Sequence, residues 1–152
     1  MTILDDIKAR LAEDWLPSIY AKRVRTQRTR SISLEIAERE NPSEILYTLL
    51  GIELKVGKRR ISCPDLATAR YLRVFARLGC RDFAIPYNIT KISVIADELE
   101  TAWQRMALLI EDKRSRSTVI KSIRLEMARI GAGDAMPEFN TVASTRDLTP
   151  NE

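Results

Sequence analysis

Three arginines recur along one side of a segment that has the pattern of a helix. Arg70, Arg73 and Arg77 are spaced three and four residues apart, so in a helix their guanidinium groups lie along one stripe. Guanidinium groups bind phosphate oxygens, and such a stripe contacts a phosphate backbone without reading its base sequence. The alternative is an exposed helix whose arginine stems cover apolar surface while the charged ends stay in water.

Two further segments are rich in cations. Five of the nine residues 22–30 are basic and none is acidic, which favours contact with phosphate; a solvated face or a linker is the alternative. Basic residues also occupy positions 58–60 and 81, and they share one face with the arginine stripe if the strands around residue 58 pack beside the helix. The candidate nucleic-acid-binding residues are Arg23, Arg25, Arg28, Arg30, Lys58, Arg59, Arg60, Arg70, Arg73 and Arg77.

Residues with the chemistry of a catalyst are fewer. The chain has no histidine to act as a general base, and it has neither a P-loop nor a GxGxxG segment. Glu53-Leu54-Lys55 resembles the Glu-x-Lys element of metal-dependent nucleases of the PD-(D/E)xK type. The resemblance implies a Mg²⁺ ion held by Glu53 and other carboxylates, with Lys55 positioning the attacking water. Those carboxylates would be Asp65 and either Glu35 or Glu44.

The nuclease pattern is incomplete in this chain. That family has an aspartate on the preceding strand, and no aspartate lies between Glu35 and Glu53. The alternation of a surface strand explains Glu53 and Lys55 equally well, as side chains that face solvent. A metal-dependent nuclease is therefore our third hypothesis, and we expect a non-catalytic protein.

The two cysteines, Cys63 and Cys80, are interpreted as small buried apolar residues. A zinc site would need both thiols together with carboxylates, because the chain has no histidine. We therefore expect neither a metal nor a cofactor.

Length and charge define the organisation of the chain. At 152 residues it has the size of one domain. Residues 1–131 carry 24 basic and 17 acidic side chains, whereas residues 132–152 are acidic and lack periodicity. We predict a single domain over 1–131 and a disordered tail over 132–152. The N-terminus lacks the pattern of a signal peptide, and no apolar stretch is long enough to cross a membrane. A cytoplasmic protein without a membrane partner is the expectation.

The centre of the predicted fold is a strand, a helix and a second strand over residues 61–86, arranged like a βαβ unit. The helix spans residues 66–78, with Ser62 or Cys63 near its N-cap and Gly79 at its end. Before it we predict a strand over 31–38, a short helix that starts at Asn41 and ends at Gly51, and a hairpin that turns at residues 57–58.

Amphipathic helices are predicted at both ends of the domain. The first starts with a capping box between Thr2 and Asp5 and ends near Pro17. At the C-terminal end, a helix over 91–112 with Thr90 as its cap is followed by a hinge at 113–117 and a helix that ends at Gly131. The fold class is α+β (mixed α/β), with a small three- or four-stranded sheet covered by the 66–78 helix.

Two functional hypotheses come ahead of the nuclease. The first is a non-catalytic nucleic-acid-associated or regulatory protein that contacts the phosphate of DNA or RNA through its arginine-rich surfaces. The second is a protein–protein adaptor or assembly subunit that acts through its C-terminal helices. A second copy of the chain, bound through the terminal helices, is a further possible partner.

Overall fold

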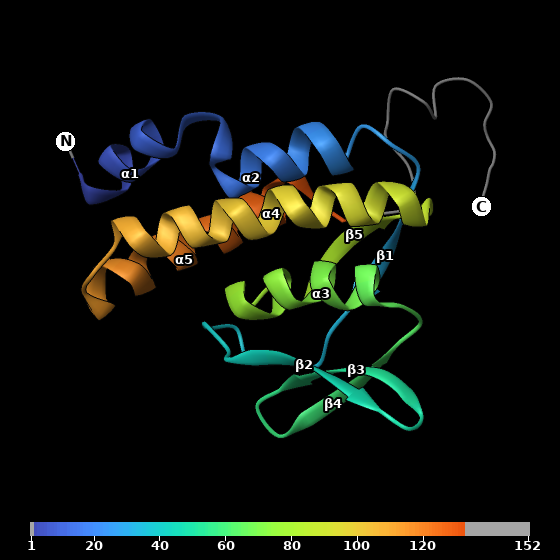
Figure 1. Ribbon diagram of the computed structural model, residues 1–152. Helices are drawn as coiled ribbons and strands as arrows, with labels where there is room; N and C mark the ends of the chain where they lie inside the picture. The colour runs from blue at the N-terminus through green and yellow to red at the C-terminus, as the bar shows by residue number, and fades with distance from the viewer. Residues whose placement is uncertain (1, 133–152) are drawn as a thin grey trace.

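The N-terminal and C-terminal helices of this protein lie together, and a small three-stranded sheet lies on the far side of the central helix (Figure 1). The computed structural model describes residues 2–132. The predicted tail, residues 132–152, lies outside the described residues from residue 133 on. The predicted boundary between domain and tail at residue 131 stays a prediction. The elements are α1 (Ile3–Leu11), α2 (Leu16–Ile19), β1 (Thr29–Ser33), β2 (Ser43–Thr48), β3 (Gly51–Val56), β4 (Arg59–Cys63), α3 (Leu66–Leu78), β5 (Asp82–Pro86), α4 (Ile89–Leu109) and α5 (Lys113–Ile130).

The α+β class is confirmed, together with a three-stranded sheet covered by the predicted central helix. Strands β2, β3 and β4 form an antiparallel sheet in that order. Leu54 on β3 lies opposite Ile45 on β2 and Ile61 on β4, so the three side chains share one face. Helix α3 packs on this sheet, and Leu54 is fully buried.

Helix α3 has the predicted extent and a different N-cap. Its cap is Asp65, whose carboxylate accepts a hydrogen bond from the N–H of Thr68 at 2.7 Å, rather than Ser62 or Cys63. Its C-terminal residue is followed by Gly79, as predicted, with a φ of 77°. At Gly79 the backbone of Arg39 lies so close that an added Cβ would be 2.3 Å from the Arg39 carbonyl oxygen. The glycine therefore serves both the left-handed backbone and a close crossing of two chain segments.

The prediction of a short helix from Asn41 to Gly51 is wrong, because this segment contains strand β2. The Asn41 side chain does not cap a helix: its Nδ2 donates to the carbonyl oxygens of Ala37 at 2.8 Å and Ala76 at 3.2 Å. β2 instead pairs with β3 through a two-residue turn at positions 49–50. Pairing along the whole strand overrides a cap-like sequence that local propensity alone would make helical.

The strand–helix–strand segment is not a βαβ unit, because its two strands belong to different sheets. β5 pairs antiparallel with β1, while β4 is in the three-stranded sheet. On β5, the N–H of Ala84 donates to the hydroxyl of Tyr20 at 2.9 Å, and its carbonyl oxygen accepts from the hydroxyl of Tyr71 at 2.6 Å. Two buried tyrosines thus occupy the hydrogen-bonding groups that a third strand would use.

The N-terminal region forms two helical segments instead of one. The predicted capping box is present, since Thr2 and Asp5 bond reciprocally at the start of α1. α1 ends at Leu11, and a 3₁₀ turn over Ala12–Asp14 leads into α2. The predicted end near Pro17 is therefore wrong: Pro17 lies in the first turn of α2, where its missing N–H costs nothing. A π-helical turn over Tyr20–Val24 follows.

The C-terminal helices pack their apolar stripes inside the chain. The side chains of Leu99, Met106 and Ile123 are fully buried, and the apolar stripes of both helices belong to the main core. Asn88 caps α4 in place of Thr90, and Asp112 caps α5, so residues 113–117 are the first turn of a helix rather than a hinge. Gly131 follows the end of α5, as predicted. Within residues 2–132, no helix has the length and apolar character needed to span a bilayer.

We expect Gly79→Ala to destabilise the protein more than Gly57→Ala does. Both glycines have positive φ, 77° and 62°, but a Cβ at Gly57 would meet nothing within 4 Å. The Gly57 variant should cost about 1–2 kcal/mol for its backbone conformation alone. The Gly79 variant should cost about 1–3 kcal/mol more, because it also forces the Arg39 backbone away. Urea denaturation measures both, and equal costs would contradict the close crossing.

Candidate functional site: a groove lined by cations

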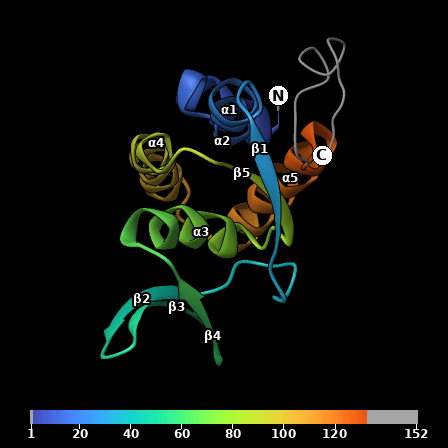
Figure 2. The same cartoon turned by 90° about the vertical axis from the view of Figure 1, so that its right-hand side faces the viewer.

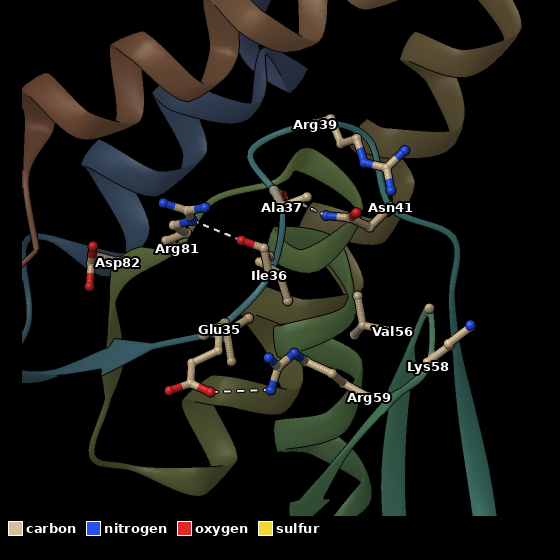
Figure 3. Close-up of a pocket in the computed structure, with 12 residues that line it drawn as sticks. Glu35, Ile36, Ala37, Arg39, Asn41, Val56, Lys58, Arg59, Arg81 and Asp82 are labelled. Atoms are coloured by element: carbon tan, nitrogen blue, oxygen red, sulfur yellow. Dashed lines mark hydrogen bonds and ion pairs between the residues drawn. The ribbon is translucent and has the colours of Figure 1, made fainter.

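A groove of about 850 Å³ lies where the linker between β1 and β2, residues 34–42, passes the turn between β3 and β4 (Figure 3). We call it the cationic groove. Leu34, Ile36 and Val56 are apolar residues of its lining. The charged residues that line it are Arg39, Lys58, Arg59 and Arg81, with Glu35 and Asp82 as the acids. Four positive and two negative side chains give the lining a net charge of +2.

The linker that carries Arg39 is held in place by hydrogen bonds to Arg81 and to the end of α3. The N–H of Leu34 donates to the carbonyl oxygen of Arg81 at 2.7 Å, and Nε of Arg81 donates to the carbonyl oxygen of Ile36 at 2.7 Å. Asn41 is buried and bonds the linker to the end of α3. One wall of the groove is therefore fixed by hydrogen bonds to the main chain of the linker and by the buried Asn41 side chain.

The cations of the groove are weakly neutralised. Nη1 of Arg59 lies 3.2 Å from Oε1 of Glu35, which points across from the linker in Figure 3, but the Glu35 side chain is 85% exposed. Arg81 pairs with Glu38 at the rim at 3.7 Å, and both side chains are more than half exposed. Arg39 and Lys58 form no ion pair within residues 2–132. Exposed ion pairs contribute about 0–1 kcal/mol, so an anion with several oxygens competes with them readily.

The predicted arginine stripe of α3 lies against α4 rather than on an open surface. Nε of Arg70 is 3.2 Å from both carboxylate oxygens of Glu100, and Nη2 of Arg73 is 3.0 Å from Oε2 of the same residue. Arg70 also pairs with Asp97. These hydrogen bonds, first those to Glu100, raise the pKa of Arg70 above its usual value. The charges of Arg70 and Arg73 are thus balanced inside the molecule.

Arg77 completes the stripe and packs on an aromatic ring. Its guanidinium carbon lies 5.9 Å from the centre of the Trp103 ring, a cation–π distance. Burial lowers the pKa of Arg77, and the neighbouring Arg73 acts in the same direction. All three arginines of the stripe therefore take part in packing between α3 and α4, and the hairpin cations do not join them.

The cations of residues 22–30 are also dispersed. Arg23 pairs with Glu98 of α4 at 2.9 Å, and Arg25 is buried, with its Nη1 donating to the hydroxyl of Thr29 at 2.9 Å. Arg28 lies over the ring of Tyr87 at 5.4 Å. Arg30 is an exposed residue of β1. Arg23 also lines a smaller hollow of about 420 Å³ with Lys22 and Lys91, between the π-helical turn and the start of α4.

Of the ten candidate residues, the cationic groove contains Lys58 and Arg59. Their neighbour Arg60 points to the other face of the sheet, where it pairs with Glu53 at 3.3 Å. Two groove cations, Arg39 and Arg81, were not among the candidates. Arg81 stood out only as a neighbour of the α3 stripe, and nothing local marks Arg39, because its position depends on the crossing at Gly79.

The residues considered for catalysis have structural contacts. Glu53 pairs with Arg60, and Lys55 lies 4.0 Å from Glu44 on the same solvent-facing side. Among residues 2–132, no group of three or more histidine, cysteine or acidic side chains could hold a metal ion. Burial raises the pKa of the Cys80 thiol to about 12, and burial also raises that of Cys63.

No protein-family model matches this chain, and the comparisons with curated proteins and with solved structures likewise find no match. The site has to be interpreted from its own geometry.

We expect Glu100→Gln to lower the free energy of unfolding by about 1–3 kcal/mol, because it removes the charge that Arg70 and Arg73 share in a partly buried position. The carboxylate of Glu98, on the same helix, pairs with Arg23 at the surface and provides the control. Glu98→Gln should cost less than about 1 kcal/mol. Chemical denaturation at neutral pH measures both variants. If the two cost the same, Glu100 does not hold the α3–α4 contact.

Proposed function

We propose that this protein is a non-catalytic nucleic-acid-binding protein that contacts phosphate through the cationic groove. The observation that carries the proposal is the convergence of four cations from three separate segments on one groove. Arg39 comes from the linker, Lys58 and Arg59 from the β3–β4 hairpin, and Arg81 from the residue before β5. Segments that lie far apart in sequence have no local reason to place like charges together.

The chemistry of the groove suits a phosphodiester backbone. Arginine presents several N–H donors in one plane and matches two phosphate oxygens at once, while lysine adds a compact charge. Such contacts set affinity and register without selecting bases, so DNA and RNA both remain partners within the proposal. We place this binding in the cytoplasm, where thiols such as those of Cys63 and Cys80 stay reduced.

The adaptor hypothesis receives no support from the C-terminal helices, because their apolar stripes are covered by the rest of the chain. The nucleic-acid hypothesis is favoured instead, with its contact surface at the groove rather than along α3.

We expect the double variant Arg39→Gln/Lys58→Gln to bind short labelled DNA and RNA more weakly than the unchanged protein. Each lost phosphate contact should lower the slope of log affinity against log salt by about 0.7–0.9, so the double variant should lose about 1.4–1.8. Fluorescence anisotropy over a series of salt concentrations measures the slope.

The matched control is Lys121→Gln/Arg129→Gln, which removes the same charge from exposed positions on α5. This control should change affinity and slope much less than the groove variant does. Equal losses in the two variants would show that net charge, and not the groove, governs binding. Absence of binding to any of the probes would contradict the proposed function itself.

A further inference from the structure

Strand β2 is an open edge of the three-stranded sheet. It pairs with β3 on one side and, within residues 2–132, with no strand on the other. Figure 2 shows β2 at the outer margin of the sheet, beside β3 and on the side away from β4. In an antiparallel ladder alternate residues of an edge strand direct their N–H and C=O groups outward. Those of β2 are available to another strand.

The β2 edge has fewer of the features that protect edge strands from pairing than the β4 edge has. Natural edges carry charges, prolines or bulges that block the approach of another strand. β4, the other edge, has Arg59 and Arg60 and is followed by Pro64. β2 is preceded by Pro42 but has the single charge of Glu44, and its centre is Ile45-Leu46-Tyr47, which has strong β-propensity. The β4 edge of the sheet is thus more strongly protected by charge against pairing than the β2 edge.

The turn that follows β2 carries two leucines in full contact with solvent. Leu49 is 106% exposed and Leu50 is 94% exposed, while the adjacent Tyr47 is 72% exposed. The turn is ordered, since the N–H of Leu50 donates to the hydroxyl of Thr48 at 3.2 Å. Two-residue hairpin turns usually contain asparagine, aspartate or glycine. Two exposed leucines beside an exposed tyrosine form an apolar patch of the kind that marks an interaction surface.

We propose that β2 pairs antiparallel with β2 of a second copy of this chain, across a two-fold axis. Placing Leu46 opposite Leu46 of the second copy puts Ile45 opposite Tyr47 and Glu44 opposite Thr48, so the register opposes no like charges. It also keeps the face covered by α3 on the same side in both copies. A continuous sheet results, with three strands from each copy.

This register also covers the exposed turn. Continuing the pairing by one and two residues brings Leu49 opposite Ser43 and Leu50 opposite Pro42 of the second copy. A pair of β4 edges would instead place Arg59 and Arg60 of two copies together, which like-charge repulsion disfavours. Pairing of β2 with β4 would be head-to-tail and would not close into a dimer. The absence of opposed like charges therefore favours β2–β2 pairing over β4–β4 pairing, and the closure of this arrangement into a dimer favours a second copy as its occupant.

Cysteine cross-linking of the full chain tests the pairing. Directly opposed Cα atoms in an antiparallel pair lie about 4.5–5.5 Å apart, within the span of a disulfide. We expect Leu46→Cys to form a covalent dimer under mild oxidation. Ser62→Cys, at an exposed position of β4, is the matched control and should stay uncross-linked. Cys63 and Cys80 are buried and remain in place in both variants.

Sedimentation without oxidation supplies a second measurement. The unchanged chain should sediment as a dimer, and Leu46→Lys should weaken the dimer by about tenfold or more, because two like charges then face each other at the axis. A monomeric unchanged chain overturns the proposal. Equal cross-linking of Leu46→Cys and Ser62→Cys would reflect non-specific encounter of the chains and overturns the proposal. A dimer that neither Leu46 variant affects uses another surface and overturns it as well. None of these outcomes depends on nucleic-acid binding.

Discussion

Glu100 neutralises the arginine stripe of α3 and joins that helix to α4. Its carboxylate accepts hydrogen bonds from Arg70 and Arg73 at the contact between α3 and α4, with Asp97 beside it. Because these arginines are only about a quarter exposed, their charges stabilise the contact more than a free surface pair would. The most regular cationic pattern of the sequence thereby holds two helices together. Of the groove cations, Arg59 and Arg81 have only exposed acidic partners, and Arg39 and Lys58 form no ion pair within residues 2–132.

The division of the strands into two sheets also follows from hydrogen bonds that buried side chains make. Tyr20 and Tyr71 satisfy the N–H and carbonyl of Ala84 on the side of β5 that β1 does not use. With that side closed, the hairpin strands form their own sheet on the far side of α3, joined to β1 by the linker. This leaves a groove on one side of the linker and an open strand edge at β2. In the proposed dimer the turn at Leu49 and Leu50 lies beside Pro42 of the second copy, next to the linker that carries Arg39.

Features set by a few neighbouring residues could be predicted from the sequence. The capping box of Thr2 and Asp5, the helix end at Gly79 and the turn at Gly57 each depend on local backbone chemistry. Features set by contacts between residues far apart in the sequence could not be predicted. Asn41 has the residue type of a helix cap, yet its amide bonds to Ala76, and only the folded chain brings the two together. For the same reason the stripe on α3 could be predicted, whereas its neutralisation by Glu100 could not.

The central claim is that the contact surface for phosphate is the groove and not the arginine stripe. Nuclear magnetic resonance of the labelled protein, titrated with a short oligonucleotide, tests it most directly because every backbone amide responds separately. We expect shift changes concentrated in residues 34–41, in the turn at 57–59 and at Arg81, with the amides of α3 and α4 unchanged. Changes concentrated at Arg70, Arg73 and Glu100, or in residues 22–30, would contradict it.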